Sequence, residues 1–220
     1  MNVTFETIRS NSEVRTYITQ ADASLLALGF TEHSFAHVTK CAETASHLLE
    51  QMGYSAREAE LARIAGFMHD IGNLVNRHDH AISGASMAFT LLTKLGMDAA
   101  DIATVVTAIG HHDDSTAFPV NAVAAALILA DKTDVRRSRV RNRDTIRFDI
   151  HDRVNYAVEQ ADLTLDKTAR TITLTLSINT EVCAVMDYFE IFLNRMLLCR
   201  KAAEFFDLSF RLDVNGQNLL

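Results

Sequence analysis

Apolar residues recur every three or four positions over most of the chain up to about residue 143, a spacing that predicts amphipathic helices. Ser10 to Glu13 and Ser55 to Glu58 have the spacing of a capping box, in which a serine and a glutamate satisfy free amides at the start of a helix. Consecutive helices without intervening strands predict a helical bundle. The predicted helices cover residues 10–28, 32–52, 55–70, 80–95, 99–109 and 120–130.

The pattern changes after residue 143. Residues 161–166 and 172–178 alternate apolar and polar side chains and are joined by a short polar stretch, which is typical of a hairpin. A helix is predicted before them over 149–159, a long amphipathic helix over 180–206, and a third alternating strand over 208–214. We therefore expect a mainly α protein. A helical domain over 1–147 precedes a small α+β subdomain over 148–220 with about three strands and one long helix.

Histidine and aspartate side chains stand at the ends and edges of the predicted helices. His69 and Asp70 end the helix that begins at Ser55, and burying such a pair is costly unless something binds it. Imidazole nitrogens and carboxylate oxygens are ligands for transition metals. The other candidates are His37 (with His33 one turn earlier), His80, His112 (with the adjacent His111 as the alternative ligand) and Asp131.

Each candidate alone is more often an ordinary surface or core residue, and Asp131 can simply end its helix, although an acid there opposes the helix dipole. Together they predict two neighbouring metal positions. The sets are His37, His69, Asp70 and Asp131 for one ion, and His80 and His112, with Asp70 bridging, for a second.

The order of His37, His69-Asp70 and Asp131 resembles the HD-domain superfamily of metal-dependent phosphohydrolases, over about residues 31–143. His80 and His112 resemble the additional histidines of the two-metal subset. The resemblance implies an HD-type helical bundle that holds one or two divalent transition-metal ions, with Fe or Mn preferred and Zn, Ni, Co or Mg as alternatives.

The sequence departs from that family at two places. Many members have a lysine after Asp-Ile-Gly, where this chain has Asn73. The Gly-Tyr-Pro type of sequence that follows the double histidine in cyclic-dinucleotide phosphodiesterases is also missing. Because Asn73 is uncharged, a cation that contacts substrate phosphate must come from another part of the chain.

A basic run follows Asp131 and is the expected source of that cation. Residues 132–143 contain six basic side chains and one acid, Asp134, in a chain of formal net charge −7. Arginine binds phosphate in a bidentate manner. If the helix continues past Asp131, then Lys132, Arg136 and Arg139 share one face. We expect these three and Asn73 to bind substrate, the alternative being a solvated face or pairs with Asp144, Asp149 and Asp152.

The expected function is a phosphohydrolase that cleaves a phosphate ester or anhydride of a nucleotide or a similar small phosphorylated metabolite by metal-activated water. Asp70, His111 and Asp113 are the candidate catalytic groups, although we prefer an orienting role for the last two. The alternatives are a di-iron HD-type oxygenase, similar to myo-inositol oxygenase, and a non-catalytic ligand-binding or signalling module with a structural metal.

Composition limits the classes of binding partner and the cellular compartment that we expect. The negative charge argues against general nucleic-acid binding, and no apolar run is long enough to span a membrane. The first residues lack the apolar core of a signal peptide. Three widely spaced cysteines, Cys41, Cys183 and Cys199, predict reduced thiols in a cytoplasmic protein. The apolar stripe of 180–206 predicts packing on the sheet or a homodimer face.

Overall fold

The computed structural model describes residues 3–114, 117–141 and 150–220. Its contacts divide the chain into two compact units, Met1–Asp131 and Lys132–Leu220. The domain boundary that we expected between residues 147 and 148 lies outside the described residues. No helix of the described segments combines the length and the apolar composition needed to cross a membrane.

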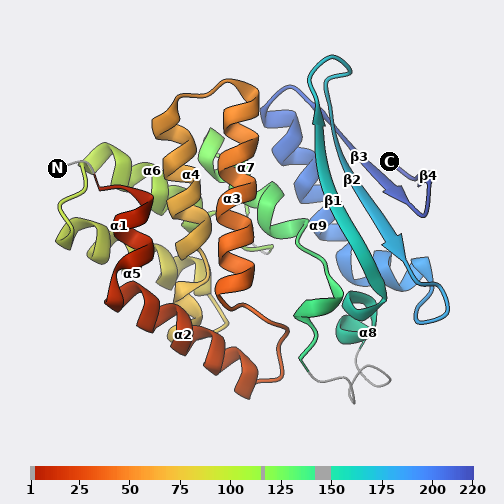
Figure 1. Ribbon diagram of the computed structural model, residues 1–220, viewed down its shortest axis with the longest axis horizontal. Coiled ribbons are helices and arrows are strands. Elements are labelled where there is room, and N and C mark those ends of the chain that lie inside the picture. Colours follow the sequence, from red (N-terminus) through yellow and green to blue (C-terminus); the bar gives the residue numbers. More distant parts are fainter. Residues whose placement is uncertain (1–2, 115–116, 142–149) are drawn as a thin grey trace. The chain divides into compact units, whose positions relative to one another are not determined.

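The first unit is a bundle of helices, as predicted (Figure 1). The last helix of this unit, α7 (Ala122–Lys132), is buried on all sides from Val123 to Ala130, in agreement with its uniformly apolar sequence. The elements are α1 (Phe5–Ser10), α2 (Ser12–Ala27), α3 (Phe35–Met52), α4 (Ala56–Met68), the 3-10 turn η1 (Ile71–Leu74), α5 (His80–Lys94), α6 (Ala99–Gly110) and α7 (Ala122–Lys132).

Two helix starts differ from the prediction. Ser55 forms the predicted capping box with Glu58. By contrast, α2 is capped by Asn11, whose side chain accepts a hydrogen bond from the amide of Val14. The helix predicted from residue 10 is therefore α2, and α1, which ends at Ser10, was not predicted; the extended backbone of Asn11 ends α1 and begins α2. The helix predicted from residue 32 begins instead at Phe35, and Ser34 caps it.

Two glycines let helices of this unit approach closely. A Cβ atom at Gly66 would lie 2.7 Å from the backbone of Ala42, so the absence of a side chain brings α4 against α3. A Cβ atom at Gly72 would lie 2.0 Å from the carbonyl oxygen of His80 and 2.4 Å from the amide nitrogen of Gly84. Gly72 therefore brings η1 against the start of α5, where a candidate metal ligand stands.

The second unit is a small sheet with helices, in agreement with the predicted α+β class. Its strands lie in the order β1-β2-β3-β4. β1 and β2 form the predicted antiparallel hairpin, whereas β3 pairs with β2 in parallel, which requires the long helix α9 as a crossover. The elements are η2 (Arg137–Arg139), α8 (Ile150–Ala157), β1 (Val158–Asp166), β2 (Thr171–Ile178), α9 (Val185–Phe205), β3 (Ser209–Val214) and β4 (Gln217–Asn218).

The fourth strand was not predicted. It has only two residues, which pair with the end of β3 after a turn at Asn215 and Gly216. So short a strand carries no alternation of apolar and polar side chains. The first strand also begins earlier than predicted, at Val158, because α8 ends at Ala157.

Candidate metal centre

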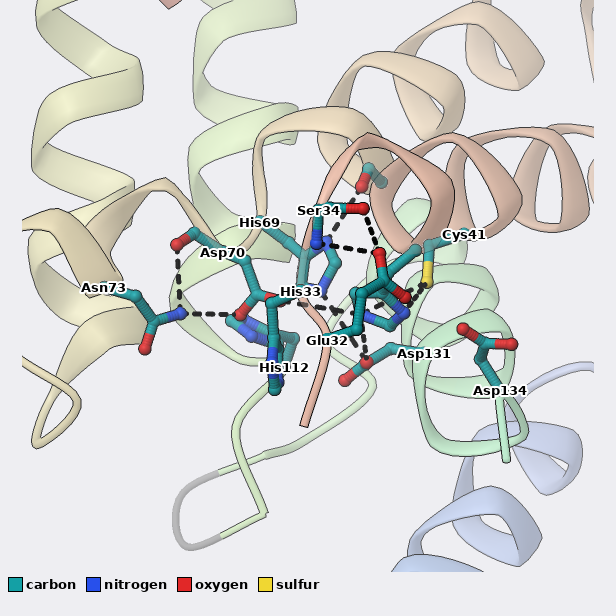
Figure 2. Close-up of polar contacts among 12 residues, drawn as sticks. Glu32, His33, Ser34, Cys41, His69, Asp70, Asn73, His112, Asp131 and Asp134 are labelled. Carbon is teal, nitrogen blue, oxygen red and sulfur yellow. Dashed lines mark hydrogen bonds and ion pairs between the residues drawn. The ribbon is translucent and has the colours of Figure 1, made fainter. Parts of the chain in front are cut away.

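The six predicted metal ligands lie in the first unit, at helix ends or in first and last turns. His69 directly follows α4, and Asp70 directly precedes η1. A residue at the end of a helix can direct its side chain beyond the helix, so side chains from several helix ends can meet at one point. Figure 2 shows Asp70 beside His69, with Asp131 and His112 nearby. The others lie in the first turn of α3 (His37), at the first residue of α5 (His80), just after α6 (His112) and in the last turn of α7 (Asp131).

The first group of ligands surrounds Asp131 and one oxygen of Asp70. The Nε2 atom of His37 lies 3.3 Å from Asp131 Oδ1 and 3.5 Å from Asp70 Oδ2. The Nε2 atom of His69 lies 3.1 Å from Asp70 Oδ2 and 3.6 Å from Asp131 Oδ1. Both imidazoles are fully buried. Cys41, which the sequence analysis did not include among the ligands, lies at the edge of this group, with its Sγ atom 3.6 Å from His37 Nδ1.

The second group surrounds the other oxygen of Asp70. The Nε2 atom of His80 lies 3.6 Å from Asp70 Oδ1 and 3.2 Å from the Nε2 atom of His112. The carboxylate of Asp113 approaches from the rim, with Oδ1 3.8 Å from His80 Nε2 and its side chain 24% exposed. The two oxygens of Asp70 therefore face two different sets of histidines, which is the arrangement of a bridging carboxylate.

Backbone carbonyls orient three of the histidine rings. Each Nδ1 atom lies within hydrogen-bond distance of the carbonyl oxygen three residues earlier, so Nδ1–H is the donor and Nε2 is left to face the centre. Histidines that bind metals are commonly held in this way. The pairs are His69 with Gly66 (2.8 Å), His80 with Arg77 (3.1 Å) and His112 with Ile109 (2.6 Å).

These residues fit a bound cation. Among the described side chains, His69 Nε2 and Asp70 Oδ2 are buried without a hydrogen-bond partner, which costs about 1–3 kcal/mol for each group. Nε2 of His80 faces Nε2 of His112 at 3.2 Å and also lies 3.4 Å from Nη1 of Arg77, so these ring nitrogens stand where a positive charge is favourable. One divalent ion with ligands at about 2.0–2.2 Å would satisfy His69 Nε2 and Asp70 Oδ2, and a second would take Nε2 of His80 and of His112.

The shifts in pKa at His69 and Asp70 indicate that positive charge is favoured beside the buried carboxylates. Burial by itself lowers the pKa of His69, but the carboxylates of Asp70 and Asp131 outweigh it and raise that pKa to about 10. Burial by itself raises the pKa of Asp70, but His69, His33 and His37 hold it well below the usual range. A proton on His69 and a metal ion are therefore alternative cations for the same carboxylates.

Asn73 links the bridging carboxylate to an arginine that the sequence analysis did not single out. Its Nδ2 atom donates to Asp70 Oδ1 at 2.9 Å, and its Oδ1 atom accepts from Arg77 Nη1 at 3.3 Å. Asn73 is buried, and its side chain contacts the candidate ligand Asp70 and Arg77. The sequence signal for Arg77 was its position four residues after Asn73 and three before His80.

The other predicted catalytic residue, His111, stands at the end of α6 and is half-buried. Its backbone amide bonds back to Thr107, and its carbonyl oxygen accepts from the amide of Phe118 at 3.2 Å. The structure places the ring of His112, rather than that of His111, against His80.

The predicted helical face of the basic run does not form, because α7 ends at Lys132. Arg136 binds the buried carboxylate of Asp134 through Nε (2.7 Å) and Nη2 (3.2 Å). Arg139 is itself buried, and its Nη1 atom donates to the carbonyl oxygen of Asp134 at 2.9 Å. The alternative partners Asp144 and Asp149 lie outside the described residues.

Comparison with known proteins supports the arrangement. The family model described as HD domain matches residues 34–138, a segment that contains all six predicted metal ligands. No curated protein and no solved structure matches the chain. The resemblance seen in the sequence is therefore confirmed at the level of the domain.

Proposed function

Residues 34–138 are an HD domain, a family made up mostly of metal-dependent phosphohydrolases, and on that basis we propose that this protein is one. It cleaves a phosphate ester or anhydride of a nucleotide or a similar small phosphorylated metabolite. The observation that carries the proposal is Asp70, whose Oδ2 atom faces His37 and His69 while its Oδ1 atom faces His80. A carboxylate so placed supports two adjacent ions, with His37, His69 and Asp131 on one side and His80 and His112 on the other.

A bound divalent ion, with Fe or Mn preferred, would bring the pKa of a water molecule toward neutrality and polarise a phosphoryl oxygen. The side chains of this chain hold and orient the reacting groups. In the reaction, the oxygen of water forms a new bond to phosphorus while the bond to the leaving group breaks.

We assign Asp113 the role of accepting a proton from the attacking water, because its carboxylate lies next to His80 and is partly exposed to solvent. His111, one residue before the ligand His112, is assigned an orienting role. Lys132, Arg136 and Arg139, which the sequence suggested for substrate phosphate, are kept only as the alternative, because Arg136 and Arg139 already contact Asp134.

The test compares two histidines of the same helix. His37 faces the centre, whereas His47 is 67% exposed and lies 3.9 Å from Glu50. Elemental analysis should find bound metal in the wild type and in His47→Ala, and less in His37→Ala. A screen of phosphorylated metabolites should show release of phosphate that follows the metal content.

The same assay without O2 separates hydrolysis from oxygenation. Activity of the Mn-loaded protein under anaerobic conditions is expected. Metal-loaded protein that oxidises a substrate only with Fe and O2 would contradict the hydrolase. Tightly bound metal without any turnover would instead favour the ligand-binding module.

A further inference from the structure

Arg77 lies in the loop between η1 and α5, beside the second group of ligands. Its Nη1 atom is 3.3 Å from Asn73 Oδ1 and 3.4 Å from His80 Nε2. Its Cζ atom lies 5.5 Å from the centre of the ring of Phe30. The carbonyl oxygen of the same residue orients His80, so backbone and side chain both contact this ligand.

The guanidinium group of Arg77 has neutral neighbours. They are an amide oxygen, an imidazole and a phenyl ring, and no carboxylate of the described residues lies within ion-pair distance of it. Arg57, which is also half-buried in this unit, instead pairs with Glu60 and Asp101 at 2.6 Å each. A half-buried cation without a counter-ion, next to a candidate metal position, is suited to an anionic ligand.

We propose that Arg77 binds phosphoryl oxygens of the substrate at the second ion position. The inference rests on the proposed function and assigns this site its phosphate-binding cation. Both hydrogen bonds that the side chain makes within the described residues use Nη1, so the donors on Nε and Nη2 are available for a bidentate contact with two oxygens.

The number of oxygens that this contact requires indicates the substrate class. A phosphate diester has two non-bridging oxygens, and both would be used by the arginine. A terminal phosphate group has three, so one is left for a metal ion. The site therefore takes a monoester or the end of a phosphate anhydride in preference to a diester.

Asn73 positions Arg77 for this task. One end of its amide accepts from the guanidinium group, and the other end donates to Asp70 Oδ1. The cation is thereby held at a set place relative to the bridging carboxylate. Arg136 and Arg139 differ from Arg77, because each already contacts Asp134.

The test uses Arg77→Ala, Arg77→Lys and a matched control, Arg63→Ala. Arg63 belongs to the same unit, is 32% exposed and lies over the ring of Phe5 at 5.6 Å, but pairs with Glu43. Metal content per chain is measured first and should be equal in all four proteins. Circular dichroism checks folding, and Arg77→Gln replaces Arg77→Ala if the latter does not fold.

Calorimetric titration of the metal-loaded proteins with inorganic phosphate is the readout that does not depend on turnover. Arg77→Ala should raise the dissociation constant by about ten- to a hundredfold, the range expected for losing a hydrogen bond to a charged group. Arg77→Lys should lie between Arg77→Ala and the wild type, and Arg63→Ala should match the wild type. Unchanged phosphate affinity in Arg77→Ala, absent binding in the wild type, or a loss of metal in Arg77→Ala would each overturn the inference.

Hydrolysis of p-nitrophenyl phosphate and bis(p-nitrophenyl) phosphate then tests the substrate class. Arg77→Ala should lose about ten- to a hundredfold in kcat/KM on the monoester and little on the diester. Equal losses on both esters would overturn the preference for a terminal phosphate. Arg77-dependent binding of phosphate without hydrolysis of either ester, or of the phosphorylated metabolites of the wider screen, would count against the proposed function while supporting the anion site.

Discussion

At the scale of single residues, the centre combines donor atoms with backbone groups that orient them. In His69, His80 and His112, Nδ1 donates to the backbone carbonyl oxygen three residues earlier. Nε2 of each ring is thereby turned toward the candidate centre. In the metal-free protein the pKa of His69 is raised, because the carboxylates of Asp70 and Asp131 lie beside its ring. Its protonation must therefore be linked to metal binding.

We predict that metal binding releases a proton at neutral pH. A free histidine loses its proton near pH 6.5, but the pKa of His69 is raised to about 10, so metal-free protein holds this proton at pH 7.5. A metal ligand must be neutral, so the ion displaces the proton, and affinity should rise about tenfold per pH unit up to about pH 10. Asp70, whose pKa is lowered, is already ionised throughout this range.

Titration calorimetry with Mn²⁺ at pH 7.5, in buffers of different ionisation enthalpy, counts the released protons. The expected number is close to one per chain for this residue. A count of zero, with affinity independent of pH between 7 and 9, would show that His69 is neutral before the metal binds.

At the scale of elements, the second group of ligands depends on the close approach of η1 and α5. Gly72→Ala places a methyl group 2.0 Å from the carbonyl oxygen of His80, against backbone that cannot rotate away. We predict that α5 shifts, that the free energy of unfolding falls by about 1–3 kcal/mol, and that metal content decreases. Denaturant unfolding and elemental analysis measure the two effects.

Gly110→Ala is the matched control for that substitution. Its added Cβ atom would meet only the Cβ atom of Ala85, at 3.7 Å, which is an ordinary contact. Since alanine is the better helix former, stability should be unchanged or slightly higher. If both variants behave alike, the close approach at Gly72 is not what holds His80 in place.

The basic run is expected to act mainly on stability. Arg139 and Asp134 are both buried, with Nη1 3.9 Å from Oδ2, and removing one partner of a buried pair costs about 3–5 kcal/mol. We predict that Arg139→Ala lowers stability by an amount of this order and leaves kcat/KM on a phosphorylated substrate within about twofold, a negligible change on the scale of ~1.4 kcal/mol per decade. The reverse result, a loss of kcat/KM at unchanged stability, would restore the role in phosphate binding expected from the sequence.

At the scale of the whole molecule, the six candidate ligands belong to one of the two compact units. Metal binding should therefore stabilise the first unit selectively. At an ion concentration one hundred times the dissociation constant the expected gain is about 2.7 kcal/mol.

Hydrogen exchange followed by mass spectrometry measures where that gain falls. Added Mn²⁺ should slow exchange in peptides from α3 to α6 and leave peptides of β1, β2 and β3 unchanged, and a chelator should reverse the effect. His37→Ala should show no such protection. Equal protection of the sheet would contradict a centre confined to the first unit.

Local patterns in the sequence were enough to predict the main elements of the fold and to single out the candidate ligands. Helical periodicity, the capping box at Ser55 and the hairpin of β1 and β2 depend on neighbours in the chain, so they could be predicted directly. The choice of Asp70 as bridge came from ligand chemistry and a family resemblance, whereas the adjacent His111 and His112 could not be told apart by sequence. The boundaries at Asn11, Ser34 and Val158 were missed, because several polar residues there can cap or end an element.

Only the tertiary structure decided the contacts between segments distant in the chain. It determined which oxygen of Asp70 faces which histidine, that β3 runs parallel to β2, and that α7 stops at Lys132. It also placed Arg77 beside His80 through Asn73. The physical reason is that residue type specifies what a side chain can bind, whereas the packing of helices, allowed by Gly66 and Gly72, specifies which partners come within reach.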